Sequence, residues 1–153
     1  MLTDDLYQTV LLKPVKELAN KLFIVSGYAS ATFSRRHLLE VLKINKDIKI
    51  SLIIGMSSNK KDHSAFLDLV KNYSSNFKAY YFNGKPEVHA KLYAWYKNKE
   101  PFIGYSGSSN YSQFGFFKEM QQNNIVEDNP NEIYDYFNSL ISDAVSVSKY
   151  EVT

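Results

Sequence analysis

The spacing of apolar and polar residues along this chain predicts helices that alternate with strands. Between residues 6 and 22, apolar side chains recur at helical spacing, but Pro14 interrupts the pattern, so we expect one kinked helix or two short ones. The same spacing predicts helices over residues 32–44 and 62–73 and a last helix that begins near Pro130. Short apolar runs predict the strands, which are 22–25, 48–55, 77–82, 89–96, 102–105 and 121–127.

Alternating elements of this kind predict the class of fold. They favour an α/β sandwich, in which helices cover both faces of a mixed, largely parallel sheet. The length of 153 residues is that of one domain, so residues 1–153 are expected to fold as a single unit. Small-residue loops at residues 26–27, 56–58 and 107–108 each follow a predicted strand. Because ligands bind beyond the carboxyl ends of strands in such sheets, we expect a site among these loops.

Composition narrows the possible chemistry. The chain has no cysteine, which excludes disulfides, thiolate metal sites and cysteine nucleophiles, and which is compatible with a reducing cytoplasm, the expected location. No apolar run approaches the roughly 20 residues of a membrane span, so no membrane partner is expected. The N-terminus is acidic and lacks the basic region of a signal peptide.

The charges are unevenly distributed. Residues 1–126 carry 17 Lys and Arg against 10 Asp and Glu, whereas residues 127–153 carry 1 against 6. A basic body suits a polyanionic partner, although an ordinary solvated surface beside an acidic terminal helix has the same pattern. Within the basic part, four cations in loops or at helix starts are candidates for contact with a DNA backbone, with a solvated surface as the alternative for each. They are Arg35, Arg36, Lys60 and Lys61.

Two short motifs carry the candidate chemistry. His89 and Lys91 lie two positions apart on a predicted strand, so their side chains should point to one face. A Gly-Ser-Ser-Asn turn after the next strand brings the Ser108 hydroxyl and the Asn110 amide beside them. An imidazole is a nucleophile, and the other three groups neutralise or hydrogen-bond phosphate oxygens. Together the motifs predict hydrolysis of a phosphodiester.

The combination resembles the His-x-Lys … Gly-Ser-x-Asn signature of the phospholipase D superfamily. The chain looks closest to the metal-independent restriction endonucleases of the BfiI and NgoFVII type and to the small phospholipase-D-like nucleases. Residues 24–28, 52–57 and 89–93 are also similar to that endonuclease domain, so the resemblance extends from Leu22 to the final helix. It implies a phospholipase-D-like fold and an endonuclease that works without a metal or any other cofactor.

The resemblance also implies a role for each motif residue. His89 is the nucleophile, which forms a phosphohistidine intermediate, and Lys91 neutralises the non-bridging phosphate oxygens. Asn110 donates hydrogen bonds to the same group, and Ser108 supports it or contacts the phosphate. A covalent intermediate splits one difficult displacement into two easier ones, and fixed donors stabilise the charge of the transition state.

The acidic residue of the family pattern is not at its usual position in this chain. The superfamily often has an Asp soon after His-x-Lys, and here that position is Tyr96. The endonuclease branch uses instead a downstream Glu that orients the catalytic His, and the spacing from Asn110 puts it at Gln121. We expect Glu119, on the same face of an extended segment, to take this role, with Gln121 as the rival; Glu127 lies further along. An amide there would stabilise the imidazolium less, leaving a slow or inactive enzyme.

The number of histidines predicts the oligomeric state. The chemistry needs one imidazole to attack phosphorus and another to protonate the leaving oxygen. His37 and His63 have no Lys two positions later, so they are expected to be surface or helix-face residues, and no cluster resembles a metal site. A two-fold homodimer in which both copies of His89 meet is the simplest solution, and the resemblance implies it too.

DNA is the expected substrate, and three interpretations of the whole protein stay open. The chain is expected to be the catalytic domain of a type II restriction enzyme whose C-terminal DNA-recognition domain is missing here, or else a stand-alone nonspecific nuclease. A phosphodiesterase acting on phospholipid or another small diester has the same signature, although no amphipathic interfacial helix is visible. A catalytically impaired nucleic-acid-binding module of the same fold would explain an amide at Gln121.

Overall fold

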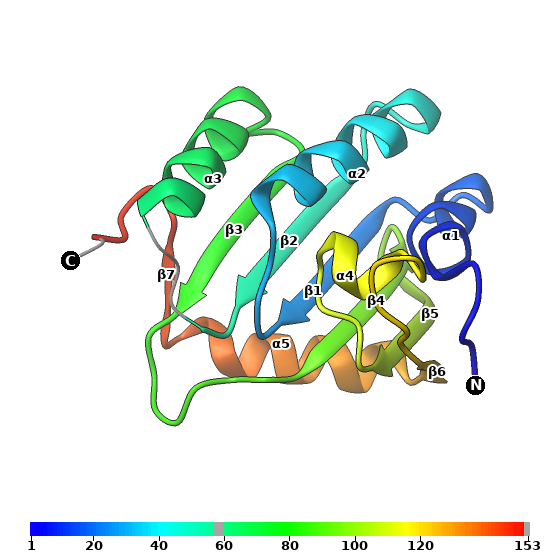
Figure 1. Cartoon of the computed structure of the whole chain (residues 1–153). Helices are drawn as coiled ribbons and strands as arrows, with labels where there is room; N and C mark the ends of the chain where they lie inside the picture. Colours follow the sequence, from blue (N-terminus) through cyan, green and yellow to red (C-terminus); the bar gives the residue numbers. More distant parts are fainter. Residues whose placement is uncertain (57–59, 152–153) are drawn as a thin grey trace.

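A single seven-stranded sheet forms the centre of the molecule (Figure 1). The computed structural model describes residues 1–56 and 60–151, so Ser57 and Ser58 of the predicted loop lie outside the described residues. The strands are β1 (Lys21–Ser26), β2 (Lys49–Ile54), β3 (Phe77–Phe82), β4 (Lys91–Lys97), β5 (Glu100–Gly107), β6 (Ile125–Asp128) and β7 (Ala144–Ser146). The helices are η1 (Tyr7–Leu12), α1 (Lys13–Lys16), α2 (Ala31–Ile44), α3 (Lys60–Asn72), α4 (Gln113–Phe116) and α5 (Pro130–Ile141).

The strand order is β6-β5-β4-β1-β2-β3-β7, and the sheet is mixed. The pairs β1–β2 and β2–β3 are parallel, whereas the other four are antiparallel, so the expectation of a largely parallel sheet is wrong. Parallel neighbours need a long crossover, and the two parallel pairs are those whose strands are connected through the helices α2 and α3. The polar turn at residues 97–101 is too short for one, so β4 and β5 form a hairpin.

Helices cover both faces of the sheet, as expected (Figure 1). Figure 1 shows α2 and α3 on one face and α5 crossing the other. The larger core lies under α2, where Phe33 and Leu38 pack with sheet residues such as Ile24. On the opposite face, Phe137 and Leu140 of α5 pack against the sheet. Residues 24 and 25 of β1 therefore enter different cores, as the alternation of side chains in a strand requires.

The N-terminal helix is divided into two short pieces, as the position of Pro14 predicts. A π-helical segment, η1, is followed by a single α-helical turn, α1. Pro14 has no N–H to donate to Val10, and the Val10 carbonyl accepts instead from Trp95 Nε1 at 2.7 Å. The Leu11 carbonyl accepts from His37 Nε2 at 2.9 Å. The irregular helix thus offers its carbonyls to distant side chains.

Several element boundaries differ from the predicted ones. β4 begins at Lys91, so His89 precedes the strand instead of starting it. β6 is confined to Ile125–Asp128, because residues 118–120 form a turn and residues 121–124 are irregular. The short elements α4 and β7 were not predicted, since three or four residues are too few to display a hydrophobic period.

Candidate active site

Three strand ends meet at one edge of the sheet. In the β1–β4 pair Ser26, the last residue of β1, lies opposite Lys91, the first residue of β4. In the next pair Leu92 lies opposite Ser106, so β5 ends beside the start of β4. The His-x-Lys and Gly-Ser-Ser-Asn motifs, which are separate in sequence, therefore lie at the same edge.

The backbone at His89 crosses directly over two glycines. The Val88 N–H donates to the Gly55 carbonyl at 3.2 Å. A Cβ atom on Gly55 would lie only 2.0 Å from the Val88 carbonyl oxygen, and one on Gly27 would lie 3.2 Å from the His89 Cα. No side chain fits at Gly55, and Gly27 permits close contact, so glycine at the ends of β1 and β2 brings His89 onto the sheet edge. The His89 side chain itself is exposed.

A hydrogen bond from Lys91 to His89 joins the two residues of the His-x-Lys motif. The Lys91 Nζ donates to the His89 carbonyl at 2.6 Å. Residues directly opposite in an antiparallel pair share a face, so Lys91 projects on the same side as Ser26, toward α2. Because His89 lies before β4, strand alternation does not align the two side chains, and the two residues are instead linked by this hydrogen bond.

The Asn110 amide is fixed by the segment that follows β1. Its Oδ1 accepts from the Tyr28 N–H at 3.1 Å and lies 3.2 Å from the Ser26 hydroxyl. The Ser26 hydroxyl also accepts from the Tyr111 N–H at 3.0 Å. With Oδ1 held by the chain, Nδ2 makes no hydrogen bond within the described residues, and it is the donor that a phosphate oxygen needs. Sequence reasoning marked residues 26–27 as a loop near the site but missed these contacts.

The Gly-Ser-Ser-Asn turn is supported from three sides. The Ser108 hydroxyl donates to Asn123 Oδ1 at 2.9 Å, and it accepts from a backbone N–H of the same segment. The buried Tyr93 hydroxyl donates to the Ser109 carbonyl at 2.6 Å. A Cβ on Gly115 would lie 1.8 Å from the Asn110 carbonyl oxygen, so α4 packs on the turn only with glycine there. The contacts of Ser108 fit the supporting role.

Tyr28, whose N–H holds the Asn110 amide, is half exposed. The residue as a whole is 48% exposed. Partial burial and, secondarily, the Asp62 carboxylate raise the pKa of the Tyr28 phenol. The hydroxyl is therefore neutral at physiological pH and remains a hydrogen-bond donor.

The structure places Glu119 away from the position expected for it. The expectation required an extended segment, but the N–H groups of Met120 and Gln121 both donate to the Phe117 carbonyl, which closes a turn. Glu119 is exposed and borders a hollow with Arg36 on the side of the N-terminal helix. The premise that Glu119 shares a strand face with Gln121 is therefore wrong.

Gln121, the rival to Glu119, connects to the motif turn. Its Nε2 donates to Asn123 Oδ1 at 3.1 Å, the same oxygen that accepts from Ser108. Asn123 is buried, and its Nδ2 donates to the Phe114 carbonyl at 2.6 Å. Residues 121–123 thus bring a network of side-chain amides to the Gly-Ser-Ser-Asn turn. Within the described residues this network contains no carboxylate.

The four candidate DNA-binding cations lie on α2 and α3. Arg35 and Arg36 are in the second turn of α2, and Lys60 and Lys61 begin α3; all four are exposed. Arg36 is engaged within the chain, since its Nε lies 3.4 Å from Glu40 Oε1. Both helices start just after the strand ends β1 and β2, which adjoin the candidate active site.

The two other histidines make structural contacts. His37 lies on a face of α2, which agrees with one of the two expected positions, but it is fully buried, with its Nδ1 2.5 Å from the Tyr111 hydroxyl, so the expectation of a surface position is wrong for it. His63 is partly buried and its Nε2 donates to the Val147 carbonyl at 2.8 Å. In residues 1–56 and 60–151 no three metal-binding side chains gather into a possible ion site. Within the same ranges no helix has the length and apolar content of a membrane-crossing segment.

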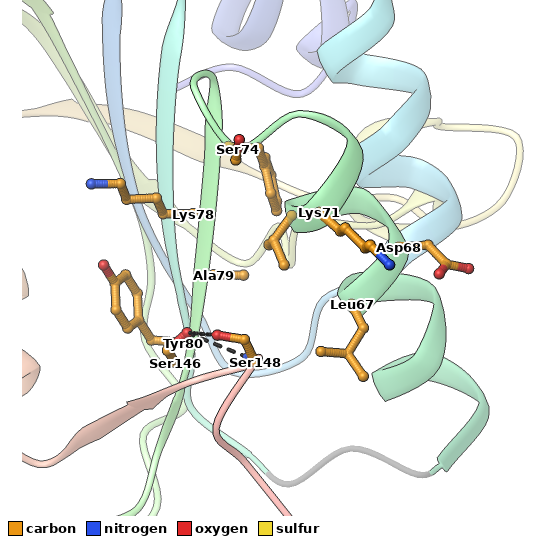
Figure 2. Close-up of a pocket in the computed structure, with 11 residues that line it drawn as sticks. Leu67, Asp68, Lys71, Ser74, Lys78, Ala79, Tyr80, Ser146 and Ser148 are labelled. Carbon is orange, nitrogen blue, oxygen red and sulfur yellow. Dashed lines mark hydrogen bonds between the residues drawn. The ribbon is translucent and has the colours of Figure 1, made fainter.

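A separate hollow of about 700 Å³ lies between α3, β3 and β7 (Figure 2). Lys71 lines it from α3 and Lys78 and Tyr80 from β3, while Ser146 and Ser148 are joined to each other by hydrogen bonds (Figure 2). None of its lining residues belongs to the two motifs. The hollow is therefore distinct from the candidate active site.

Comparison with known proteins identifies the family. Residues 4–153 match the family described as the NgoFVII restriction endonuclease N-terminal PLD domain, where PLD denotes phospholipase D. No curated protein matches the chain. Among solved structures, NucT from Helicobacter pylori is similar with a TM-score of 0.60 and 15% identity, covering 95% of this chain and 96% of that one. Nuc from Salmonella typhimurium, a phospholipase D family member, has a TM-score of 0.59 and 13% identity, covering 95% and 91%.

A third similarity shows how widely the fold is used. Polyphosphate kinase from Porphyromonas gingivalis has a TM-score of 0.59 and 10% identity, with 92% of this chain covering 21% of that one. The fold therefore does not define the reaction, whereas the family match spans nearly the whole chain. That match confirms the resemblance carried by the two motifs: the chain belongs to the NgoFVII restriction endonuclease N-terminal PLD domain family, and it is an endonuclease domain of the phospholipase D type.

Proposed function

We propose that this domain hydrolyses DNA without a metal ion, through a covalent phosphohistidine at His89 in a dimeric site. The observation that carries the proposal is the meeting of both motifs over residues 26–28. The backbone of His89 packs on Gly27, and the Asn110 amide is held by Ser26 and the Tyr28 N–H. A nucleophile and a phosphate-oxygen donor thus flank one short segment, with the Lys91 ammonium beside them.

The reaction proceeds in two displacements. A nitrogen of His89 attacks phosphorus and forms an N–P bond, while the bond to one bridging oxygen breaks and that oxygen takes a proton from a second imidazole. Water then attacks phosphorus and gives its proton to that imidazole, and the N–P bond breaks to release His89 and the phosphate-ended strand. Lys91 and the Asn110 Nδ2 group stabilise the non-bridging oxygens in both steps.

The need for a second imidazole supports a homodimer. Both other histidines of the chain are committed, His37 to the Leu11 carbonyl and Tyr111 and His63 to the Val147 carbonyl. A second copy of His89 from a two-fold related subunit supplies the missing proton donor. Its exposure at the sheet edge is compatible with such a meeting.

Surface charge supports DNA as the substrate. Arg35, Lys60 and Lys61 are exposed near the starts of helices that begin at the edge where the motifs lie. Cations at a helix start oppose the helix dipole, so Lys60 and Lys61 add little to helix stability and are available for phosphate. Phosphate contacts carry no sequence information, so the type II restriction role further requires a separate recognition domain.

A metal-free cleavage assay tests this function. We expect the protein to nick and linearise plasmid DNA in EDTA while releasing no product from phosphatidylcholine vesicles or bis(4-nitrophenyl) phosphate. DNA is favoured because several phosphates can contact the basic helices at once, which a small diester cannot do. Faster turnover of lipid or of the small diester than of DNA would contradict the proposal.

A catalytically impaired DNA-binding module is the second candidate. It is favoured by one observation, that Gln121 joins the Ser108 turn while Glu119 lies on another side. An uncharged amide stabilises a histidinium less than a carboxylate does. DNA binding in EDTA without any cleavage or covalent adduct would favour this candidate over the nuclease.

The dimeric site predicts the behaviour of mixed dimers. Heterodimers of one wild-type and one His89→Ala subunit, isolated through two different affinity tags, are expected to retain at most about one hundredth of wild-type activity, because each central site would hold one imidazole where two are needed. Doubly tagged wild-type dimers provide the control. Retention of about half the activity would indicate independent sites and would contradict the shared one.

A further inference from the structure

A buried contact connects the N-terminal helix with the candidate active site. His37 of α2 is fully buried and bridges two groups, with Nε2 2.9 Å from the Leu11 carbonyl and Nδ1 2.5 Å from the Tyr111 hydroxyl. Tyr111 is also fully buried and directly follows Asn110 in the chain. Neither motif includes His37 or Tyr111, and the proposed reaction uses neither side chain.

We propose that His37, acting through the Tyr111 hydroxyl, is a positioning residue that aims the Asn110 amide at the scissile phosphate. The inference rests on the proposed function. It assigns a role to the one histidine of the chain that solvent does not reach.

Tyr111 is anchored at three points, which makes it a rigid support for Asn110. Its N–H donates to the Ser26 hydroxyl at 3.0 Å, and its carbonyl accepts from the Ser30 N–H at 3.0 Å. The third anchor is the hydrogen bond that the Tyr111 hydroxyl donates to His37, and of the three it is the one made by the side chain. Ser26 also lies 3.2 Å from Asn110 Oδ1, so a rotation of Tyr111 would disturb the amide through a shared partner.

The N-terminal helix selects the tautomer that this contact needs. The Leu11 carbonyl can only accept a hydrogen bond, so His37 Nε2 must be the N–H and Nδ1 must be the acceptor for the Tyr111 hydroxyl. The groups that face the ring are the Tyr7 and Tyr111 rings and, from α2 itself, the Glu40 carboxylate. Burial lowers the pKa of His37 to about 4 despite the Leu11 carbonyl and Glu40, so the ring is neutral at physiological pH.

Removal of one hydroxyl tests the inference. In Tyr111→Phe, kcat for DNA cleavage in EDTA is expected to fall about ten- to a hundred-fold with KM changed less than about two-fold, since small misplacements of a catalytic group slow the chemical step. Tyr96→Phe is the matched control. It also removes a hydroxyl from a buried tyrosine, one that lies 2.7 Å from Asn131 Oδ1 at the start of α5, and its kcat should stay at the wild-type value.

A double-mutant cycle shows whether His37 and Tyr111 act as a unit. His37→Gln retains a donor for the Leu11 carbonyl but removes the acceptor at Nδ1. If the contact is what matters, the double variant should be no slower than the slower single variant. Multiplicative losses in the double variant, or an unchanged kcat in Tyr111→Phe, would overturn the inference.

A readout without catalysis separates this inference from the proposed function. The side-chain amide signals of Asn110 in a ¹⁵N-labelled NMR spectrum are expected to shift in Tyr111→Phe and in His37→Gln but not in Tyr96→Phe. Unchanged Asn110 signals in both variants would overturn the positioning role. A wild-type protein that fails to cut DNA while these signals shift would contradict the nuclease proposal and leave the structural link supported.

Discussion

His89→Ala is expected to lower the rate of DNA cleavage in EDTA at least about ten-thousand-fold, the scale seen when an enzyme nucleophile is removed. Without this imidazole no N–P bond forms, and the Lys91 and Asn110 contacts, which involve other atoms, remain to bind the phosphate. The measurement is single-turnover cleavage of a labelled duplex with enzyme in excess. DNA affinity, measured by fluorescence anisotropy, should change by less than about three-fold.

His63→Ala is the matched control for this experiment, because it removes an imidazole that lies outside the candidate site. His63 donates to the Val147 carbonyl at 2.8 Å, so its loss affects stability more than cleavage. Quenching of wild-type protein on ³²P-labelled DNA with alkaline SDS should trap an acid-labile adduct that His89→Ala lacks and His63→Ala retains. Cleavage by His89→Ala at the wild-type rate would refute the assignment of the nucleophile.

The free energy of unfolding is expected to fall by about 3 kcal/mol between pH 7 and pH 4 because of His37 alone. Burial lowers the pKa of this residue from its usual 6.5 to about 4 in the folded protein. Above pH 6.5 both states are neutral at this position, and the full stability is present. As the pH falls toward 4, the unfolded chain binds a proton that the folded protein does not, so unfolding becomes easier.

Urea unfolding at several pH values from 7 to 4 measures this loss. Other groups titrate in the same range, so the quantity to compare is the difference between wild type and His37→Gln, which cannot bind a proton at this site. His37→Gln should be less stable at pH 7 and show a flatter pH dependence than the wild type. Equal slopes for wild type and His37→Gln would contradict the buried, neutral state.

The parts of the site that are local in sequence were predictable. The two motifs are short and ordered along the chain, and the family match over residues 4–153 agrees with them. The partners that hold them were not, because Ser26 and Asn110 are 84 residues apart and meet only through the pairing of β1, β4 and β5. The expected position of Glu119 was wrong because hydrogen bonds to the Phe117 carbonyl close a turn there. A turn lacks the alternation of side chains on which the expectation depended.

The contrast between local patterns and contacts distant in sequence also explains why the strand directions and the burial of His37 were not predicted. Hydrophobic runs located the strands, but direction depends on connection length, and the short polar turn at residues 97–101 should have indicated an antiparallel pair. A histidine within an amphipathic helix looks like a surface residue. Its burial depends on Tyr111, 74 positions later, and on the Leu11 carbonyl, 26 positions earlier.

The long-range construction of the sheet edge has a consequence for the protein during its synthesis. Ser26 emerges early, yet its opposite residue Lys91 follows 65 positions later, and the Ser108 hydroxyl finds its acceptor only when Asn123 is made. Contacts so distant in sequence form late in folding, since chain closure must precede them. A growing chain therefore cannot hold the two motifs together in this way until most of its length has been translated.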